Sequence, residues 1–328
     1  MSDTDLTVAV TGPTGTFGFG LMPLLESDDR VSRIVGIARR PFDPAAHGWS
    51  KMEYRRGDVR DPDALEDAFR DADVVVHLAF LIIGRNRETA RAINIEGTVN
   101  AFRAAAAAGA RRFVYASSVA AYGFHRDNPV GMREDWPTRP AGRLRYAQEK
   151  AELEELLRSA AAEHPDVALY TLRPPIVLGP HAVGAKDLLS GSVGGLARRL
   201  AGGLGRLRIP VLVPDVPIQF VHEDDVGHAL LQCVVAAGPP GAYNIAGDGV
   251  LSALDVAREF GFIPISVPAW PTHAAARTLA RLPFLPATAQ WVEALSHPAI
   301  MDTTLARTQL GWAPRFSGLE ALRDTRRK

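Results

Sequence analysis

The sequence of 328 residues contains a single cysteine, Cys233, and no excess of charge of either sign. One cysteine excludes an internal disulfide and a zinc site built from several cysteines, and it is typical of proteins in a reducing compartment. Lysine plus arginine and aspartate plus glutamate number 37 each, so no basic field of the whole chain favours nucleic acid or an anionic membrane as partner. His77, His181 and His222 lack the spacing of metal ligands, and we predict no metal site.

Long uncharged apolar runs are missing as well. None reaches about 18 residues, the length that a membrane-spanning helix needs, so we predict no membrane span. The first residues, Met1 to Asp5, are polar and lead directly into an apolar run, without the basic segment that precedes the core of a signal sequence. We therefore expect a cytoplasmic protein. An apolar fraction of 47% is ample for a buried core.

Short apolar runs alternate with helical patterns over the first half of the chain, which is typical of a parallel sheet with crossover helices. The strand-like runs are 7–10, 34–37, 74–78, 113–116 and 168–172, and the helical ones are 63–69, 92–107 and 144–162. Strand patterns resume at 218–221 and 242–246. The stretch 178–217 between them is rich in glycine and leucine and has no aromatic residue, so we interpret it as a mobile lid or a set of loops.

A glycine-rich loop, Thr11-Gly12-Pro13-Thr14-Gly15-Thr16-Phe17-Gly18, follows the first strand and precedes a predicted helix. Glycine permits a tight turn and a close approach of backbone N–H groups to a pyrophosphate at a helix N-terminus, where the helix dipole favours negative charge. A glycine loop alone is a weak signal, but its place between strand and helix predicts a dinucleotide-binding loop. The residues expected to contact the cofactor are Gly12, Thr14, Gly15, Thr16, Phe17 and Gly18.

Tyr146 and Lys150 lie four residues apart, downstream of the pair Ser117-Ser118. On a helix, residues four apart lie one above the other on the same face. The reference pKa of a tyrosine is near 10. A neighbouring ammonium and a cationic nicotinamide ring would both lower it toward the range in which a tyrosine acts as acid or base. The pattern predicts acid–base chemistry coupled to a redox cofactor.

These motifs, in this order, resemble the short-chain dehydrogenase/reductase superfamily, in its extended branch of epimerase-, dehydratase- and steroid-dehydrogenase-like enzymes. Further matches along nearly the whole chain are 57–61 (GDVRD), 77–79 (HLA), 94–98 (NIEGT), 117–123 (SSVAAYG), 172–175 (LRPP), 220–225 (FVHEDD) and 310–312 (LGW). The resemblance implies an α/β fold: a Rossmann-type doubly wound parallel sheet with a smaller C-terminal substrate-binding domain. It would assign 1–174 and 218–247 to the NAD(P)-binding domain, and 175–217 and 248–328 to the substrate-binding domain.

Carried over by position, the resemblance makes Ser118, Tyr146, Lys150 and Asn94 the catalytic residues. Ser118 would hydrogen-bond the substrate oxygen, with Ser117 as its structural neighbour, and Tyr146 would move the proton. Lys150 would hold the nicotinamide ribose hydroxyls and lower the pKa of Tyr146. Asn94 would support the proton path from the central helix, or else be a structural amide within that helix.

Cofactor preference is expected to depend on the end of the second strand, Val35-Gly36-Ile37-Ala38-Arg39-Arg40. NAD-preferring relatives carry an acid there that binds the adenosine 2′-hydroxyl. This chain has two arginines instead, which suit the 2′-phosphate of NADP. We therefore expect NADP, with NAD or merely solvated arginines as the alternatives. The resemblance places the remaining cofactor contacts at Asp58 and Val59, which would bind the adenine, and at Leu78, Ala79 and Pro175, which would line the pyrophosphate and nicotinamide.

The residues around the expected pocket favour an apolar small-molecule substrate. Nucleotide-sugar members of the branch generally place an arginine where Ile218 stands, and an asparagine after the Arg-Pro strand, whereas 174–243 contains none. Any one of the apolar residues is as readily explained as core. They are Phe80, Leu81, Ile82, Ile83, Leu188, Leu189, Leu196, Trp270 and Trp291.

We therefore predict an NADP(H)-dependent oxidoreductase of this superfamily that transfers a hydride between nicotinamide and an apolar carbonyl or alcohol. One alternative is an NAD(P)-dependent epimerase or dehydratase, sugar-nucleotide-like, that keeps its cofactor bound and returns the hydride. Another is a non-catalytic cofactor-binding sensor. The resemblance also suggests a homodimer through the helices at 92–107 and 144–162, whose alanine-rich faces allow close packing.

Overall fold

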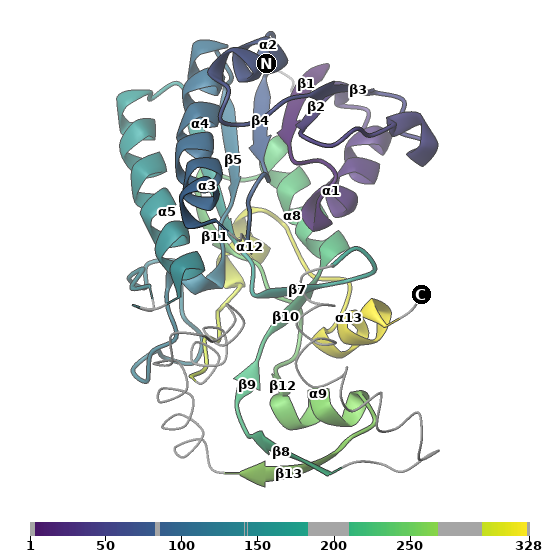
Figure 1. The fold of residues 1–328 in the computed structure, drawn as a ribbon, viewed down its shortest axis with the longest axis vertical. Helices are drawn as coiled ribbons and strands as arrows, with labels where there is room; N and C mark the ends of the chain where they lie inside the picture. Colours follow the sequence, from purple (N-terminus) through teal and green to yellow (C-terminus); the bar gives the residue numbers. More distant parts are fainter. Residues whose placement is uncertain are drawn as a thin grey trace.

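The central element of the fold is a parallel sheet, drawn in Figure 1. The computed structural model describes residues 4–82, 86–140, 142, 144–182, 210–267 and 297–326. Within these residues, seven strands follow the order β11-β6-β5-β4-β1-β2-β3. Their bounds are β1 Leu6–Thr11, β2 Val31–Ala38, β3 Met52–Arg56, β4 Val74–His77, β5 Arg112–Ala116, β6 Ala168–Arg173 and β11 Gly241–Asn244. The Rossmann-type doubly wound sheet that the sequence predicts is confirmed.

The middle strands are apolar on both faces because helices cover both sides of the sheet. Along β1, Val8 and Val10 pack into one apolar layer and Ala9 into the other, as the alternation of side chains along a strand requires. The first layer contains α1 (Thr16–Ser27) and α8 (Glu223–Val234), and the second contains α2 (Pro62–Phe69), α4 (Gly97–Ala107) and α5 (Arg145–Glu163). The site described below lies where the strands of this sandwich end.

Two glycines let α1 and α8 cross in backbone contact. A Cβ atom at Gly227 would lie 2.1 Å from the carbonyl oxygen of Gly20, and one at Gly20 would lie 2.2 Å from the carbonyl oxygen of Glu223. Neither position accepts a larger residue unless one of the helices shifts. The crossing therefore holds α1, and with it the glycine-rich loop that precedes α1, in a defined position.

The other described strands form three short pairs beside the main sheet (Figure 1). β7 (Ile176–Leu178) pairs in parallel with β10 (Phe220–His222), β9 (Pro217–Ile218) antiparallel with β12 (Leu251–Ser252), and β8 (Pro210–Pro214) in parallel with β13 (Ile263–Val267). The remaining described helices of this half are α9 (Ala253–Glu259), α12 (Thr304–Gln309) and α13 (Gly318–Thr325). β7 and β10 pair although the expected boundaries put them in different domains, and those boundaries stay a prediction.

Two elements differ from their prediction. The helix expected at 92–107 is interrupted: α3 (Arg87–Arg91) runs into a π-helical turn at Ala92–Glu96 before α4 begins. Such π-helical turns often occur at functional sites. The spacing of apolar residues does not reveal this one, because that spacing is helical over the whole of 92–107. The apolar pattern does not predict β3 either, because this strand lies at the edge of the sheet and only its Met52 is buried.

Some expectations fall on residues outside the described ones. Of the lid expected at 178–217, residues 183–209 lie outside the described residues. So do the candidate pocket residues Ile83, Leu188, Leu189, Leu196, Trp270 and Trp291. In the ranges that the structure describes, no helix has both the length and the apolar character needed to cross a membrane.

Candidate active site

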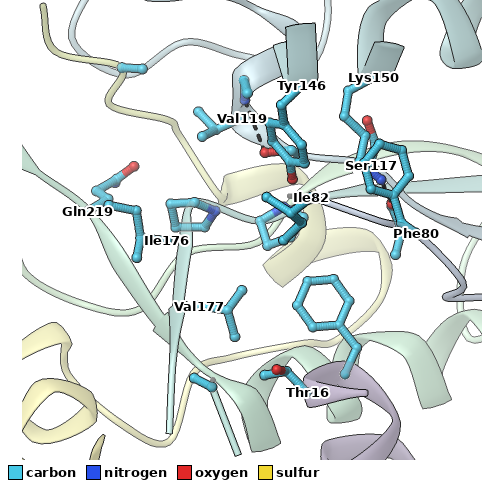
Figure 2. Close-up of a pocket in the computed structure, with 18 of the residues that line it drawn as sticks. Thr16, Phe80, Ile82, Ser117, Val119, Tyr146, Lys150, Ile176, Val177 and Gln219 are labelled. Atoms are coloured by element: carbon cyan, nitrogen blue, oxygen red, sulfur yellow. Dashed lines mark hydrogen bonds between the residues drawn. The ribbon is translucent and has the colours of Figure 1, made fainter. Parts of the chain in front are cut away.

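A cavity of about 440 Å³ lies beyond the carboxyl ends of the central strands (Figure 2). The strand order reverses at β1, and the crevice at such a reversal is where doubly wound sheets bind their ligands. The expected residues that line the cavity are Gly12, Gly15, Thr16, Phe17, Gly18, Leu78, Ser118, Tyr146, Lys150 and Pro175. The expected residues that do not line it are Thr14, Arg39, Arg40, Asp58, Val59, Ala79 and Asn94.

The glycine-rich loop has the geometry of an anion cradle. Gly12 has a φ of +69°, and a Cβ atom there would lie 3.0 Å from the backbone of Ala79, so only glycine fits without strain. A Cβ at Gly18 would lie 2.0 Å from the carbonyl oxygen of Pro13. The N-terminus of α1 has no side-chain cap at Gly15 and no acid in its first turn. Its N–H groups and positive dipole end therefore suit the pyrophosphate of a dinucleotide.

Tyr146 and Ser118 meet at one end of this cavity. Tyr146 enters from the first turn of α5, and its phenol hydrogen-bonds the hydroxyl of Ser118. The Ser118 oxygen also accepts the backbone N–H of Ala120 at 3.2 Å. Burial raises the pKa of Tyr146 to about 12, although the bond to Ser118 lowers it in part. The phenol is therefore protonated near neutral pH, and the lowering of its pKa by Lys150 stays a prediction.

Lys150 comes from the same helix, one turn further on, and is almost completely buried. Its Nζ donates to the carbonyl oxygen of Ala116 at 2.6 Å and to the hydroxyl of Tyr115 at 3.2 Å. Burial lowers the pKa of the ammonium to about 7, and the carboxylates of Glu154 and Glu149 act against this shift. The charge of Lys150 therefore depends closely on what surrounds it.

Asn94 lies in the π-helical turn and contacts the chain that follows β4. Its Oδ1 accepts the backbone N–H of Leu81 at 2.8 Å, and its Nδ2 donates to the Leu81 carbonyl oxygen at 3.1 Å. The same Nδ2 donates to Glu149 at 2.7 Å. These contacts position the segment after β4, and the catalytic role expected for Asn94 stays a prediction.

A buried polar network supports the site, and the sequence motifs do not indicate it. Ser117 donates to Glu154 at 2.5 Å, and Glu154 forms a buried ion pair of 2.5 Å with Arg173. Arg173 donates to the hydroxyl of Tyr122 at 2.6 Å, which in turn donates to Asn244 at 2.8 Å. One signal for this network is present in the sequence: Glu154 lies four residues after Lys150, and on a helix this spacing puts both on one face.

The expected cofactor-specificity residues lie at the far end of the glycine loop. Arg39 and Arg40 are exposed after β2. The hydroxyl of Tyr54 donates to the carbonyl oxygen of Arg40, and Arg56 donates to that of Arg39 at 3.1 Å. The backbone of both arginines is therefore held from β3, and the charge of Arg39 helps to hold the pKa of Asp58 below its ordinary value.

The two expected adenine contacts have different surroundings. Asp58 forms an ion pair of 2.7 Å with Arg60, which holds the pKa of Asp58 below its ordinary value. Val59 is buried against the start of α4, where a Cβ atom on Gly97 would lie 2.4 Å from Val59 Cγ2. The expectation that these residues bind adenine stays a prediction.

Much of the remaining wall of the cavity is formed by apolar side chains: Phe80, Ile82, Val119, Phe124, Ile176, Val177 and Ile218. Two polar residues accompany them, Gln219 and His297. The Gln219 amide accepts the backbone N–H of Met301 at 2.8 Å and donates to its carbonyl oxygen at 3.0 Å. Among the described lining residues there is no arginine, aspartate or glutamate, and Lys150 supplies the only cation of the lysine and arginine type.

Histidine plays a structural part in the sheet beneath the cavity. His77 is buried between the hydroxyls of Thr11 and Thr98, at 2.9 and 3.0 Å from its two ring nitrogens. Burial lowers the pKa of His77 to about 3, with a contribution from the nearby Lys150 charge, so the ring is neutral. Within the described ranges, no group of three or more His, Cys, Asp or Glu residues could hold a metal ion.

Comparisons with known proteins cover most of the chain. The sequence model of the NAD dependent epimerase/dehydratase family matches residues 8–246. An uncharacterized protein of Mycobacterium tuberculosis is 28% identical over 325 residues, which are 97% of this chain and 82% of that protein. The ceramide reductase of Caulobacter vibrioides is 33% identical over 175 residues, 53% of this chain and 47% of that enzyme.

A solved structure has the same fold. MoeE5, in complex with UDP-glucuronic acid and NAD, superposes with a TM-score of 0.70 over 97% of both chains. Its sequence is 22% identical. At this level of identity the likeness establishes a shared fold.

Proposed function

The chain belongs to the NAD dependent epimerase/dehydratase family, and on this premise we propose that it is an NADP(H)-dependent oxidoreductase. It transfers a hydride between nicotinamide and an apolar carbonyl or alcohol. The observation that carries this proposal is the composition of the cavity: a Ser118–Tyr146–Lys150 group at one end and apolar walls without a described arginine at the other. A diphosphate-bearing substrate needs cationic or multiple hydrogen-bond donors in such a place.

The proposed roles follow from the position of each group. The start of α1 and the glycine loop bind the pyrophosphate, and Lys150 binds the nicotinamide ribose. Ser118 hydrogen-bonds the substrate oxygen and steadies the charge that develops on it. Tyr146 donates a proton to that oxygen during reduction and removes it during oxidation. The bound cofactor supplies the hydride acceptor or donor.

NADP is proposed as the preferred cofactor because Arg39 and Arg40 stand where an NAD-selective acid would be. A guanidinium group binds a phosphate through paired hydrogen bonds, which a 2′-hydroxyl cannot match. The described end of β2, from Ala38 to Arg40, has no carboxylate of its own. NAD is the alternative, since the family is NAD dependent and MoeE5 was solved with NAD.

A second candidate is an epimerase or dehydratase that returns the hydride to its substrate. The name of the family and the UDP-glucuronic acid bound to MoeE5 support this candidate more directly than net oxidation or reduction. The apolar lining and the partial likeness to a ceramide reductase favour the first. Both candidates use Ser118, Tyr146 and Lys150. They differ in whether one turnover changes the oxidation state of the cofactor: the oxidoreductase changes it, and the epimerase or dehydratase restores it.

One experiment separates the two. The purified protein is mixed with NADPH and a panel of apolar ketones and aldehydes, and the absorbance of NADPH is followed; a panel of UDP-sugars is run in parallel with product analysis. We expect NADPH consumption with a member of the first panel. Conversion of a UDP-sugar without any net change in cofactor absorbance, by a protein that purifies with bound cofactor, would favour the second candidate. Failure to bind NADPH or NADH at all would leave neither.

A homodimer through α4 and α5 and a cytoplasmic location complete the proposal. Both rest on the family resemblance and on composition. The exposed apolar side chain of Leu156 on α5 supports the choice of this face, whereas Ala101, Ala104 and Ala105 of α4 are buried in the core of the chain itself.

A further inference from the structure

Phe80 contacts both reactive side chains of α5. The centroid of its ring lies 3.8 Å from Nζ of Lys150. The ring also meets that of Tyr146 edge to face, with centroids 5.5 Å apart and planes at 88°. Figure 2 shows Phe80 beside Lys150 at one end of the cavity. None of the roles proposed above assigns a task to this ring.

The ammonium of Lys150 needs such a neighbour. An ammonium has three N–H donors, and two acceptors are available from the sheet, the Ala116 carbonyl and the Tyr115 hydroxyl. Lys150 is 3% exposed, so its contact with bulk water is small. The face of an aromatic ring carries negative charge density and attracts a cation within about 6 Å of its centroid. Phe80 offers the nearest such face: its centroid lies 3.8 Å from Nζ, compared with 4.8 Å for the ring of Tyr115 and 5.9 Å for that of Tyr146.

The chain holds Phe80 in place from behind. Phe80 lies in the segment after β4, outside any helix or strand. The next residue, Leu81, is fastened through both backbone polar groups by the carboxamide of Asn94. Asn94 is in turn bound by Glu149, the residue that precedes Lys150. A closed chain of contacts thus runs from α5 through the π-helical turn and the segment after β4, and back to α5.

We propose that Phe80 is a positioning residue for Lys150: its ring face binds the ammonium, keeps it charged and holds it in place, and Asn94 acts by fixing the segment that carries Phe80. The proposal rests on the function proposed for Lys150. It goes beyond that function because it makes a ring outside α5 one of the groups that keep the buried ammonium of Lys150 charged.

Several titratable groups surround Lys150 and enter its proton equilibrium. Tyr146, Glu149 and Glu154 lie on its own helix, Tyr115 on β5 and His77 on β4. The two carboxylates favour the charged ammonium, and Glu154 is shared with Arg173. Substitution of Phe80 changes none of these groups, so its effect on the ammonium can be read separately.

The composition of the chain makes the ammonium directly observable. The sequence has four lysines: Lys51, Lys150, Lys186 and Lys328. Lysine labelled with ¹³C at Cε gives one NMR signal for each, and the signal of Lys150 is the one lost in Lys150→Arg. Its chemical shift against pH yields the titration midpoint of the ammonium without substrate or turnover.

The test compares three variants with the wild type. Phe80→Leu keeps an apolar side chain but removes the ring face, and Phe80→Tyr keeps the face. Phe124→Leu is the matched control, because Phe124 lines the same cavity and, like Tyr146, packs against the small apolar cluster of Ala120, Leu144 and Ala147. A cation–π contact favours the charged form, so we expect Phe80→Leu to lower the midpoint by about 0.5 to 1.5 pH units, the range from an exposed to a desolvated contact. Phe80→Tyr and Phe124→Leu should leave it near the wild-type value.

A midpoint in Phe80→Leu that equals or exceeds the wild-type value, with Phe80→Tyr folded and unchanged, overturns the proposal. Phe80 would then be only a wall of the cavity. The titration is measured on the protein alone. Absence of hydride transfer to any substrate would therefore refute the proposed function and leave the result on Phe80 standing.

Discussion

At the level of single residues, the candidate site pairs a phenol and an ammonium whose pKa values move in opposite directions for one reason. Burial disfavours whichever form is charged, so it raises the pKa of Tyr146 to about 12 and lowers that of Lys150 to about 7. Near neutral pH the phenol is a proton donor already bonded to Ser118. In the function proposed above, this is the state that carbonyl reduction requires, because Tyr146 then gives up its proton.

Tyr146→Phe tests the acid role while keeping the aromatic ring and its packing against Phe80. Loss of the hydroxyl removes the proton donor, and general acid catalysis of this type contributes about 100-fold or more to the rate. We expect kcat to fall by at least that factor and the Kd for NADPH, from fluorescence titration, to stay within about twofold. Wild-type kcat in this variant would contradict the assignment.

Arg39→Ala tests cofactor choice. A charge-assisted contact to the 2′-phosphate is lost only with NADPH, so the Kd for NADPH should rise about tenfold or more, while the Kd for NADH barely changes. Arg33→Ala is the matched control: Arg33 lies on the same strand, β2, and its charge is paired with Glu53. An equal loss of affinity for both cofactors in Arg39→Ala would exclude a phosphate contact.

The buried Lys150 also predicts how stability depends on pH. Its pKa falls from 10.5 in the unfolded chain to about 7 in the folded protein. Between these values the unfolded chain binds the extra proton, so the free energy of unfolding rises with pH in this range and is lowest below it. Urea unfolding from pH 7 to 9 should show this rise for the wild type and a smaller one for Lys150→Met. Parallel curves for the two proteins would contradict the burial of a titrating lysine.

At the level of elements, the crossing of α1 and α8 controls where the glycine loop lies. Gly227→Ala would place a Cβ atom 2.1 Å from the carbonyl oxygen of Gly20, so the helices must separate. We expect a loss of about 2 kcal/mol in the free energy of unfolding, together with weaker cofactor binding. Gly142→Ala is the control, since a Cβ atom at Gly142 would meet no other atom within 4 Å. Equal stability of the two variants would contradict the contact.

Patterns of apolar residues predict some elements of this fold and miss others. The strands β1, β2, β4, β5 and β6 follow from apolar runs, because buried parallel strands are apolar on both faces. The edge strand β3 and the π-helical turn do not follow from such runs. Both depend on contacts with other parts of the chain. Met52 is buried at the edge of the sheet, and Asn94 hydrogen-bonds the backbone of Leu81. The local spacing of apolar residues does not reveal such contacts.

At the level of the whole molecule, the proposed homodimer makes a prediction about mass. Light scattering should give twice the chain mass of 35.4 kDa. Leu156 is an apolar side chain exposed on α5, and Leu156→Glu would bury a charge in the proposed interface, which should shift the protein to the monomer. Glu155→Gln is the control, because it changes the adjoining exposed position without adding a charge. A wild-type monomer, or a dimer indifferent to Leu156→Glu, would rule out this face.

The sequence by itself determined the doubly wound sheet, the glycine loop after β1 and the pairing of Tyr146 with Lys150, because each is written in short-range spacing. Tertiary structure decided the rest of the site. Phe80 reaches Lys150, and Arg173 reaches Glu154, across segments far apart in the chain. The direction of each pKa shift follows from burial, and burial exists only once the layers have packed. Local spacing therefore identifies the candidate reacting groups, while packing determines whether each of them is charged.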